Sequence, residues 1–116
     1  MHDYKKLNVW NDSIELVSEI YKITKDFPSV EKFGLTNQIN RCAVSIPSNI
    51  AEGSGRNTNG EFIHFLGYAC GSCNELETQL IIANKLNYVE EIVLNILTEK
   101  LNAIQKMIYK LIKSLK

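Results

Sequence analysis

The fold is decided by residues 34–56, which read GLTNQINRCAVSIPSNIAEGSGR. Apolar residues recur there at steps of three and four, which is typical of a helix with one buried face; they are Leu35, Ile39, Ala43, Ile46 and Ile50. Pro47 lies inside this pattern without changing its phase. A proline at this position removes a hydrogen bond to the carbonyl of Ala43 and costs about 3 kcal/mol. The stretch therefore predicts a helix that bends at Pro47 and keeps its register.

Small residues surround the proline, namely Ala43, Ser45, Ser48 and Ala51. Short side chains let a neighbouring helix approach closely and cover the disrupted turn. We therefore expect the kinked helix to form the centre of a bundle.

A helix is predicted before this stretch, from Val9 to Asp26, with Asn8 as its cap. It carries two apolar seams, the first made of Trp10, Ile14, Val17, Tyr21 and Thr24 and the second of Val9, Leu16, Ile20, Ile23 and Phe27. Phe27-Pro28 ends the helix, and residues 29–32 are expected to form a short turn. Two seams predict two neighbouring helices, and any surplus apolar surface would be buried against another subunit.

Two further helices are predicted after the stretch. Thr58 and Glu61 have the spacing of a capping box for a helix that ends near Leu86, and its core positions are Phe62, Leu66, Ala69, Cys73, Leu76, Leu80 and Ala83. The last helix begins near Val89 or Glu90 and buries Val93, Leu97, Leu101, Ile104, Ile108, Leu111 and Leu115. Short connections favour an all-α fold, an antiparallel up-and-down four-helix bundle whose second helix is kinked, in one domain spanning residues 1–116.

Composition excludes several classes of protein. The 116 residues contain 13 basic and 13 acidic side chains, so the net charge does not describe a strongly basic nucleic-acid binder. No apolar run is long enough for a membrane span and the start is not signal-like, so we expect a cytoplasmic protein. Cys42, Cys70 and Cys73 are expected to be reduced core residues, because the Cys70–Cys73 pair lies inside a helical pattern rather than at a strand-to-helix junction.

The run from Arg41 to Gly53, reading RCAVSIPSNIAEG and followed by Gly55-Arg56, carries a family resemblance. Further matches are Val9-Trp10, Ile20-Tyr21, Phe27-Pro28, Phe33-Gly34-Leu35, Glu61-Phe62, Phe65-Leu66, Gly71-Ser72, Glu75-Leu76-Glu77 and Leu86-Asn87-Tyr88. The chain resembles the four-helix-bundle proteins encoded in intervening sequences of bacterial 23S rRNA genes. The resemblance implies a small homo-oligomer, a pentamer, without a settled enzymatic activity. A related branch, the accessory variability proteins of diversity-generating retroelements, binds a reverse transcriptase and nucleic acid.

Candidate nucleic-acid contacts are the basic residues Arg41, Arg56, Lys106, Lys110, Lys113 and Lys116. Arg56 follows a glycine-rich turn and precedes a helix N-terminus, where an anion is favoured. Two interpretations stay open for each group: the turn is a phosphate contact or a plain interhelical connection, and the lysines form a basic collar in an oligomer or an ordinary solvent face.

A structural polar network is predicted for Asn49, Glu52 and Glu75, with Arg41 and Arg56 as partners of the carboxylates. The alternative, an acid/base pair of Glu52 and Glu75, lacks an accompanying nucleophile or oxyanion donor. Glu61 and His64 have metal-ligand spacing without a second such pair, so neither a metal nor another cofactor is expected. The function expected is that of a non-enzymatic oligomeric binding or scaffold protein associated with nucleic acid; the alternative is a protein–protein interaction module that binds no nucleic acid.

Overall fold

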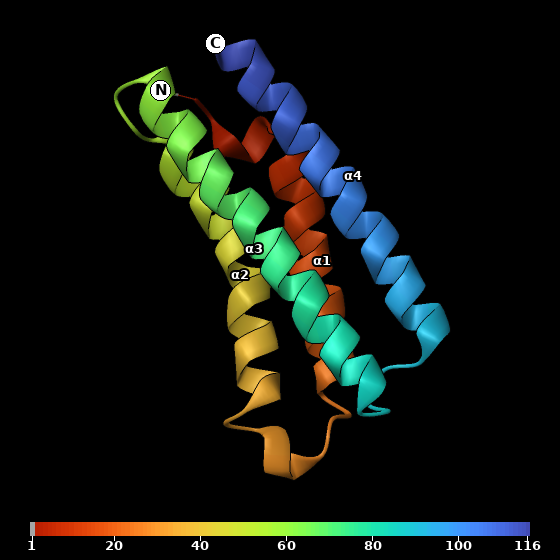
Figure 1. The fold of residues 1–116 in the computed structure, drawn as a ribbon. Helices are drawn as coiled ribbons and strands as arrows, with labels where there is room; N and C mark the ends of the chain where they lie inside the picture. Colours follow the sequence, from red (N-terminus) through yellow and green to blue (C-terminus); the bar gives the residue numbers. More distant parts are fainter. Residues whose placement is uncertain (1) are drawn as a thin grey trace.

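The computed structural model describes residues 2–116, which form an all-α fold (Figure 1). The elements in chain order are η1 (Tyr4–Lys6), α1 (Asn8–Thr24), η2 (Ser29–Glu31), α2 (Leu35–Ser54), α3 (Asn59–Lys85) and α4 (Glu91–Leu115). No strand occurs in the part of the chain that the structure describes. The four long helices therefore agree with the helices predicted from the apolar periodicity.

Each long helix packs against two others. Helix α2 packs most closely, against α3 and α1, while α4 contacts α3 and, less closely, α1. The diagonal pairs α1–α3 and α2–α4 have no Cα atoms within 8 Å of each other. Between α1 and α4, which pack less closely, the Lys100 ammonium of α4 donates to both carboxylate oxygens of Glu19 on α1, at 2.5 and 2.6 Å.

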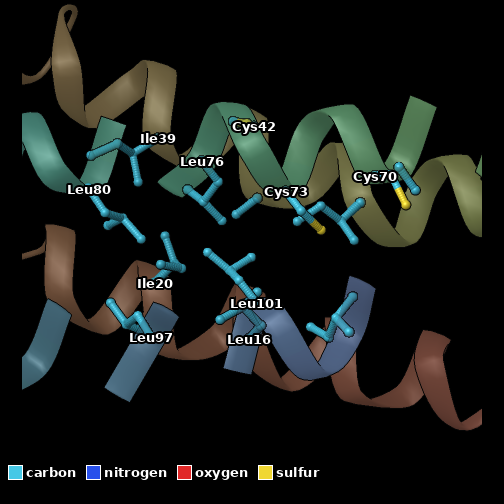
Figure 2. Packing of buried hydrophobic residues seen from close by; sticks show 14 of the residues in the cluster. Leu16, Ile20, Ile39, Cys42, Cys70, Cys73, Leu76, Leu80, Leu97 and Leu101 are labelled. Carbon is cyan, nitrogen blue, oxygen red and sulfur yellow. The ribbon is translucent and has the colours of Figure 1, made fainter. Parts of the chain in front are cut away.

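The core lies between the four helices. Figure 2 shows Leu16 and Ile20 of α1 and Leu97 and Leu101 of α4 pointing toward Leu76 and Leu80 of α3. All seven core positions predicted for α3 are buried, with at most 1% of each side chain exposed. The periodicity therefore identified most of the buried face of α3, on which Cys70 and Gln79 are buried as well.

Helix α2 continues through Pro47 without interruption, and Pro47 itself is buried. Ile39, Ala43, Ile46 and Ile50 have no exposed surface, as predicted, and Leu35 is half-buried. The small residues allow the close approach of α3 on one side: the Ser45 and Ser72 hydroxyls lie 2.7 Å apart.

The helix ends differ from the predictions in two places. Asn8 is the first residue of α1 and the capping position is Leu7, so the predicted cap is wrong. At the start of α2, the preceding turn η2 supplies the cap: the carboxylate of Glu31 accepts the Leu35 N–H at 3.1 Å. Thr58 caps α3 as predicted by accepting the Glu61 N–H at 3.1 Å, but the carboxylate of Glu61 pairs with Arg56 rather than returning to the cap.

The two predicted seams of α1 have different surroundings. In the second seam, Val9, Leu16, Ile20 and Phe27 are buried. In the first seam Ile14 and Tyr21 are 42% and 48% exposed, because α2 and α4 cover only part of the helix surface. A surplus apolar face therefore remains on α1.

Across residues 2–116, the helices are too short or too polar for any of them to span a lipid bilayer.

Candidate nucleic-acid interface

The turn between α2 and α3 presents Arg56. The guanidinium carbon lies 5.1 Å from the centre of the Phe65 ring, and Nε lies 3.4 Å from an oxygen of Glu61. The predicted pairing of Arg56 with Glu52 is therefore wrong. Helix α2 ends at Ser54, and the bend at Gly55 carries Arg56 off the face on which Glu52 lies and toward the first turn of α3.

Gly53 allows this turn to form. A Cβ atom on Gly53 would lie 2.6 Å from Cβ of Phe65 and 2.9 Å from Cδ1 of Phe62. Such separations are shorter than van der Waals contact, so only glycine lets the end of α2 lie directly on the first turns of α3. This close contact fixes where Arg56 leaves the bundle.

The end of α4 lies beside the start of α3. The Asn59 amide donates to the carbonyl of Leu115 at 3.3 Å, which joins residues 56 positions apart. Lys110, Lys113 and Lys116 are exposed along this last part of α4, and exposed Lys106 lies about one turn earlier. Arg56 and the C-terminal lysines therefore share one end of the molecule.

The first described residues reach the same end (Figure 1). The His2 N–H donates to the carbonyl of Ser54 at 3.0 Å, and the His2 ring lies 5.1 Å from the ring of Phe62. A surface hollow lined by Leu7, Asn8, Val9, Met107, Lys110, Leu111 and Ser114 separates the start of α1 from α4. This arrangement brings Lys5 and Lys6 to the end of the molecule that holds Lys110.

Sequence reasoning missed Lys5 and Lys6, because a pair of lysines outside any periodic segment carries no signal of its position. We call Lys5, Lys6, Arg56, Lys106, Lys110, Lys113 and Lys116 together the basic end. Acidic side chains near it are fewer: Asp3, which caps η1, Asp12, which lines a hollow with Ala103 one turn before Lys106, Glu52, and Glu61, which pairs with Arg56. Positive charge is therefore concentrated at one end of a chain whose net charge is zero.

Arg41 lies apart from the basic end. It is exposed in a groove of about 510 Å³ between α2 and α3, with Glu75 and Gln79 among the lining residues. Neither Arg41 nor Glu75 belongs to an ion pair within residues 2–116, and the side-chain oxygen of Gln79 is buried without a hydrogen-bond donor. The structure therefore separates Arg41 from the other predicted nucleic-acid contacts.

The predicted network of Asn49, Glu52 and Glu75 is not formed within the chain. Asn49 donates to the carbonyl of Ser45 at 2.8 Å, while Glu52 and Glu75 are exposed. Each carboxylate is one position away from a buried residue, and one position rotates a side chain by about 100° around a helix, out of the core. Small side chains connect α2 and α3 instead: besides the two serine hydroxyls, the Cys42 thiol donates to the carbonyl of Ser72 at 3.2 Å.

The three cysteines are buried free thiols, as expected. Burial raises the pKa of Cys42 to about 12, and the neighbouring Glu75 carboxylate adds to this rise. Burial likewise raises the pKa of Cys73 to about 12. Both thiols therefore stay protonated at neutral pH, the form that is a poor nucleophile.

No group of three or more His, Cys, Asp or Glu side chains suited to a metal ion occurs among residues 2–116. Glu61 and His64, which have metal-ligand spacing, are engaged separately: Glu61 pairs with Arg56, and the His64 ring lies 5.5 Å from the ring of Tyr68.

Comparison with known proteins agrees with the sequence resemblance. The chain superposes with a TM-score of 0.83 on the crystal structure of a protein with unknown function from the S23 ribosomal protein family of Bacteroides thetaiotaomicron VPI-5482. The two are 26% identical, over 90% of this chain and 98% of the other. No curated protein matches the sequence. The family profile described as 23S rRNA-intervening sequence protein matches residues 5–110, and the chain therefore belongs to that family.

Proposed function

We propose that this chain is a non-enzymatic binding or scaffold protein that acts on nucleic acid in the cytoplasm, through its basic end. The observation that carries this proposal is the gathering of Lys5, Lys6, Arg56 and the α4 lysines from three separate parts of the sequence. Contacts from lysine and arginine to phosphate supply most of the affinity of sequence-independent nucleic-acid binding. A local positive surface is sufficient for such binding, so zero net charge is no obstacle.

The proposal is tested by replacing Lys110, Lys113 and Lys116 with glutamine. Each phosphate that the protein no longer contacts keeps its counterions. We therefore expect weaker binding, and the slope of log K against log[salt] should be smaller in magnitude by about 2–3. The measurement is fluorescence anisotropy of a labelled oligonucleotide titrated at several salt concentrations.

The matched control replaces Lys22, Lys25 and Lys32, which lie near η2 at the other end of the molecule. Removing the same amount of charge there should leave the salt slope unchanged. Equal losses from both triple variants would contradict a localised interface, and binding that ignores salt would contradict a phosphate contact altogether.

We further propose an antiparallel, up-and-down order of the helices, with α2 bent at Pro47. Short connections support the first part: only residues 55–58 separate α2 from α3, and residues 86–90 separate α3 from α4. The missing N–H of Pro47 supports the bend, since the carbonyl of Ala43, four residues earlier, has no helical N–H to accept from.

We also propose that the chain assembles into a homo-oligomer, a pentamer as the family resemblance implies, through the exposed side of α1 and α2. An apolar groove there is lined by Trp10, Ile14, Val17, Val44 and Pro47 among others. Ile14 and Val44 are 42% and 38% exposed, which costs free energy in water and is relieved by contact with another copy. A ring would repeat the basic end around its axis and so increase avidity for a long nucleic acid.

Replacing Ile14 with arginine is expected to reduce the mass measured by light scattering toward that of the 13.2 kDa single chain, because a charge in an apolar interface must be desolvated. Helix content by circular dichroism should not change. The control is Ile92→Arg on α4, where the residue is 66% exposed and outside the groove. A wild-type chain that is monomeric at all concentrations would refute the assembly.

A specific observation favours the second candidate function, a protein–protein interaction module. The groove between α2 and α3 holds Arg41 and Glu75, neither of which forms an ion pair within residues 2–116, and the buried side-chain oxygen of Gln79, which accepts no hydrogen bond there. Buried polar groups normally have a partner, so a protein seated in the groove would supply one. This function predicts no nucleic-acid binding at physiological salt, which the oligonucleotide titration distinguishes directly.

A further inference from the structure

A second surface hollow lies next to the basic end, along the first turns of α3. It has a volume of about 570 Å³, and its walls include Arg56, Glu61, His64, Phe65 and Tyr68. We call it the aromatic hollow. It differs from the rest of the basic end because three aromatic rings and an arginine lie together.

The rings form a connected group. The Tyr68 ring centre lies 5.6 Å from that of Phe65 and 5.5 Å from that of His64, with both pairs close to perpendicular. The guanidinium of Arg56 lies over the face of Phe65. Tyr68 is 53% exposed and His64 is exposed, so a flat ligand has access to the aromatic surface.

The aromatic hollow is not explained by the packing of the single chain. The core of α3 is formed by Phe62, Leu66 and Ala69, and spacing along the helix puts His64 and Tyr68 on the side facing solvent. Exposed rings are costly in water, so this cluster is suited to a ligand that covers them. Such a ligand needs a flat apolar face for the rings and negative charge for Arg56 and the lysines.

A nucleotide in a single strand has both properties. Its base has an accessible π face, and its phosphates carry negative charge, whereas the bases of a duplex are already stacked on one another. Proteins that bind single strands combine a positive surface with aromatic side chains on which bases stack. The arginine has five N–H donors, more than one carboxylate can occupy, so its pairing with Glu61 leaves donors for a phosphate.

We propose that the aromatic hollow binds an unpaired base of single-stranded nucleic acid by stacking on Tyr68, while Arg56 and the basic end contact the flanking phosphates. This inference rests on the proposed function and refines it: the preferred ligand is a single strand and not a duplex. A protein segment as the occupant is an outcome of the test.

The test compares Tyr68→Leu, which keeps an apolar side chain but removes the ring, with Tyr68→Phe, which keeps the ring. Binding to a labelled 20-nucleotide oligo(dT) and to a duplex of equal length is measured by fluorescence anisotropy. We expect Tyr68→Leu to weaken single-strand binding roughly 5- to 100-fold and to leave duplex binding unchanged, while Tyr68→Phe retains the wild-type affinity. The control is Phe33→Leu, since this ring is 88% exposed and follows η2 at the other end of the molecule from the basic end.

A 2-aminopurine base within the single strand gives an independent readout, because its fluorescence is quenched when it stacks. Quenching by the wild type and by Tyr68→Phe, and not by Tyr68→Leu, supports the proposal. Unchanged single-strand affinity in Tyr68→Leu overturns it while leaving the proposed function standing, provided that the lysine variant still loses binding. A Tyr68→Leu protein whose oligomeric mass changes while its affinity does not would identify the aromatic hollow as a protein contact, and absence of binding to either ligand would refute both proposals.

Discussion

Replacing Phe62 with alanine is expected to lower the free energy of unfolding by about 3–5 kcal/mol. The ring is 1% exposed in the first turn of α3, beneath the end of α2 and 5.1 Å from the ring of His2. Removing it leaves a cavity at the point where α2, α3 and the first described residues meet. Urea unfolding followed by circular dichroism, at a fixed protein concentration, measures the difference.

Phe33→Ala is the matched control, because it makes the same chemical change at a ring that is 88% exposed. Its effect should stay within about 0.5 kcal/mol, as is usual for surface positions. If both variants unfold at the wild-type urea concentration, then Phe62 does not occupy the packed position described above. Loss of nucleic-acid binding by Phe62→Ala is also expected, since the turn that presents Arg56 rests on this ring.

Replacing Gly53 with alanine is expected to lower the free energy of unfolding by about 1–3 kcal/mol, although alanine is ordinarily the better helix former. The new Cβ would lie 2.6 Å from Cβ of Phe65, an atom held by the backbone of α3. A rotation of the Phe65 side chain cannot relieve that clash, so the two helices must move apart. The measurement is again the shift of the urea midpoint.

Gly67→Ala and Gly71→Ala test the same substitution without the clash. Both glycines lie inside α3, and an added Cβ at either meets no atom within 4 Å. Each of these variants should gain about 0.5–1 kcal/mol, because alanine loses less backbone entropy on folding. A stabilising effect of Gly53→Ala similar to that of the controls would contradict the close contact between α2 and α3.

Most of the helical fold could be predicted from the sequence because burial imposes a period on it. On α3 the apolar residues at Phe62, Leu66 and Ala69 begin a pattern that continues to Ala83, and every predicted member is buried. Helix α2 kept its pattern through Pro47, and the helix itself continues there. The helix ends were less predictable, since a cap depends on a single local hydrogen bond: Asn8 was expected to cap α1, but Leu7 occupies that position and makes no side-chain hydrogen bond there.

The candidate site could be predicted only in part. Charge and spacing on α4 predicted Lys110, Lys113 and Lys116 as candidate contacts, but no local pattern reveals that Lys5 and Lys6 approach them from the other end of the sequence. The predicted polar network was wrong because a residue next to a buried one in the sequence need not be buried itself. Glu75 precedes the buried Leu76, yet its side chain is exposed. Long-range contacts such as that between Asn59 and Leu115 determine which charged residues lie close together. The apolar periodicity of the sequence does not predict such contacts.

Both ends of the described chain lie beside the residues proposed to contact nucleic acid. An affinity tag fused to either terminus would therefore stand in front of the ligand, and a polyhistidine tag would add its own binding to phosphates. A fluorescent protein or an immobilisation tag inserted at Asn87 would lie away from that surface, because Asn87 is exposed in the connection between α3 and α4, at the other end of the molecule. Binding assays on this family member should therefore use a cleaved chain or an internal label.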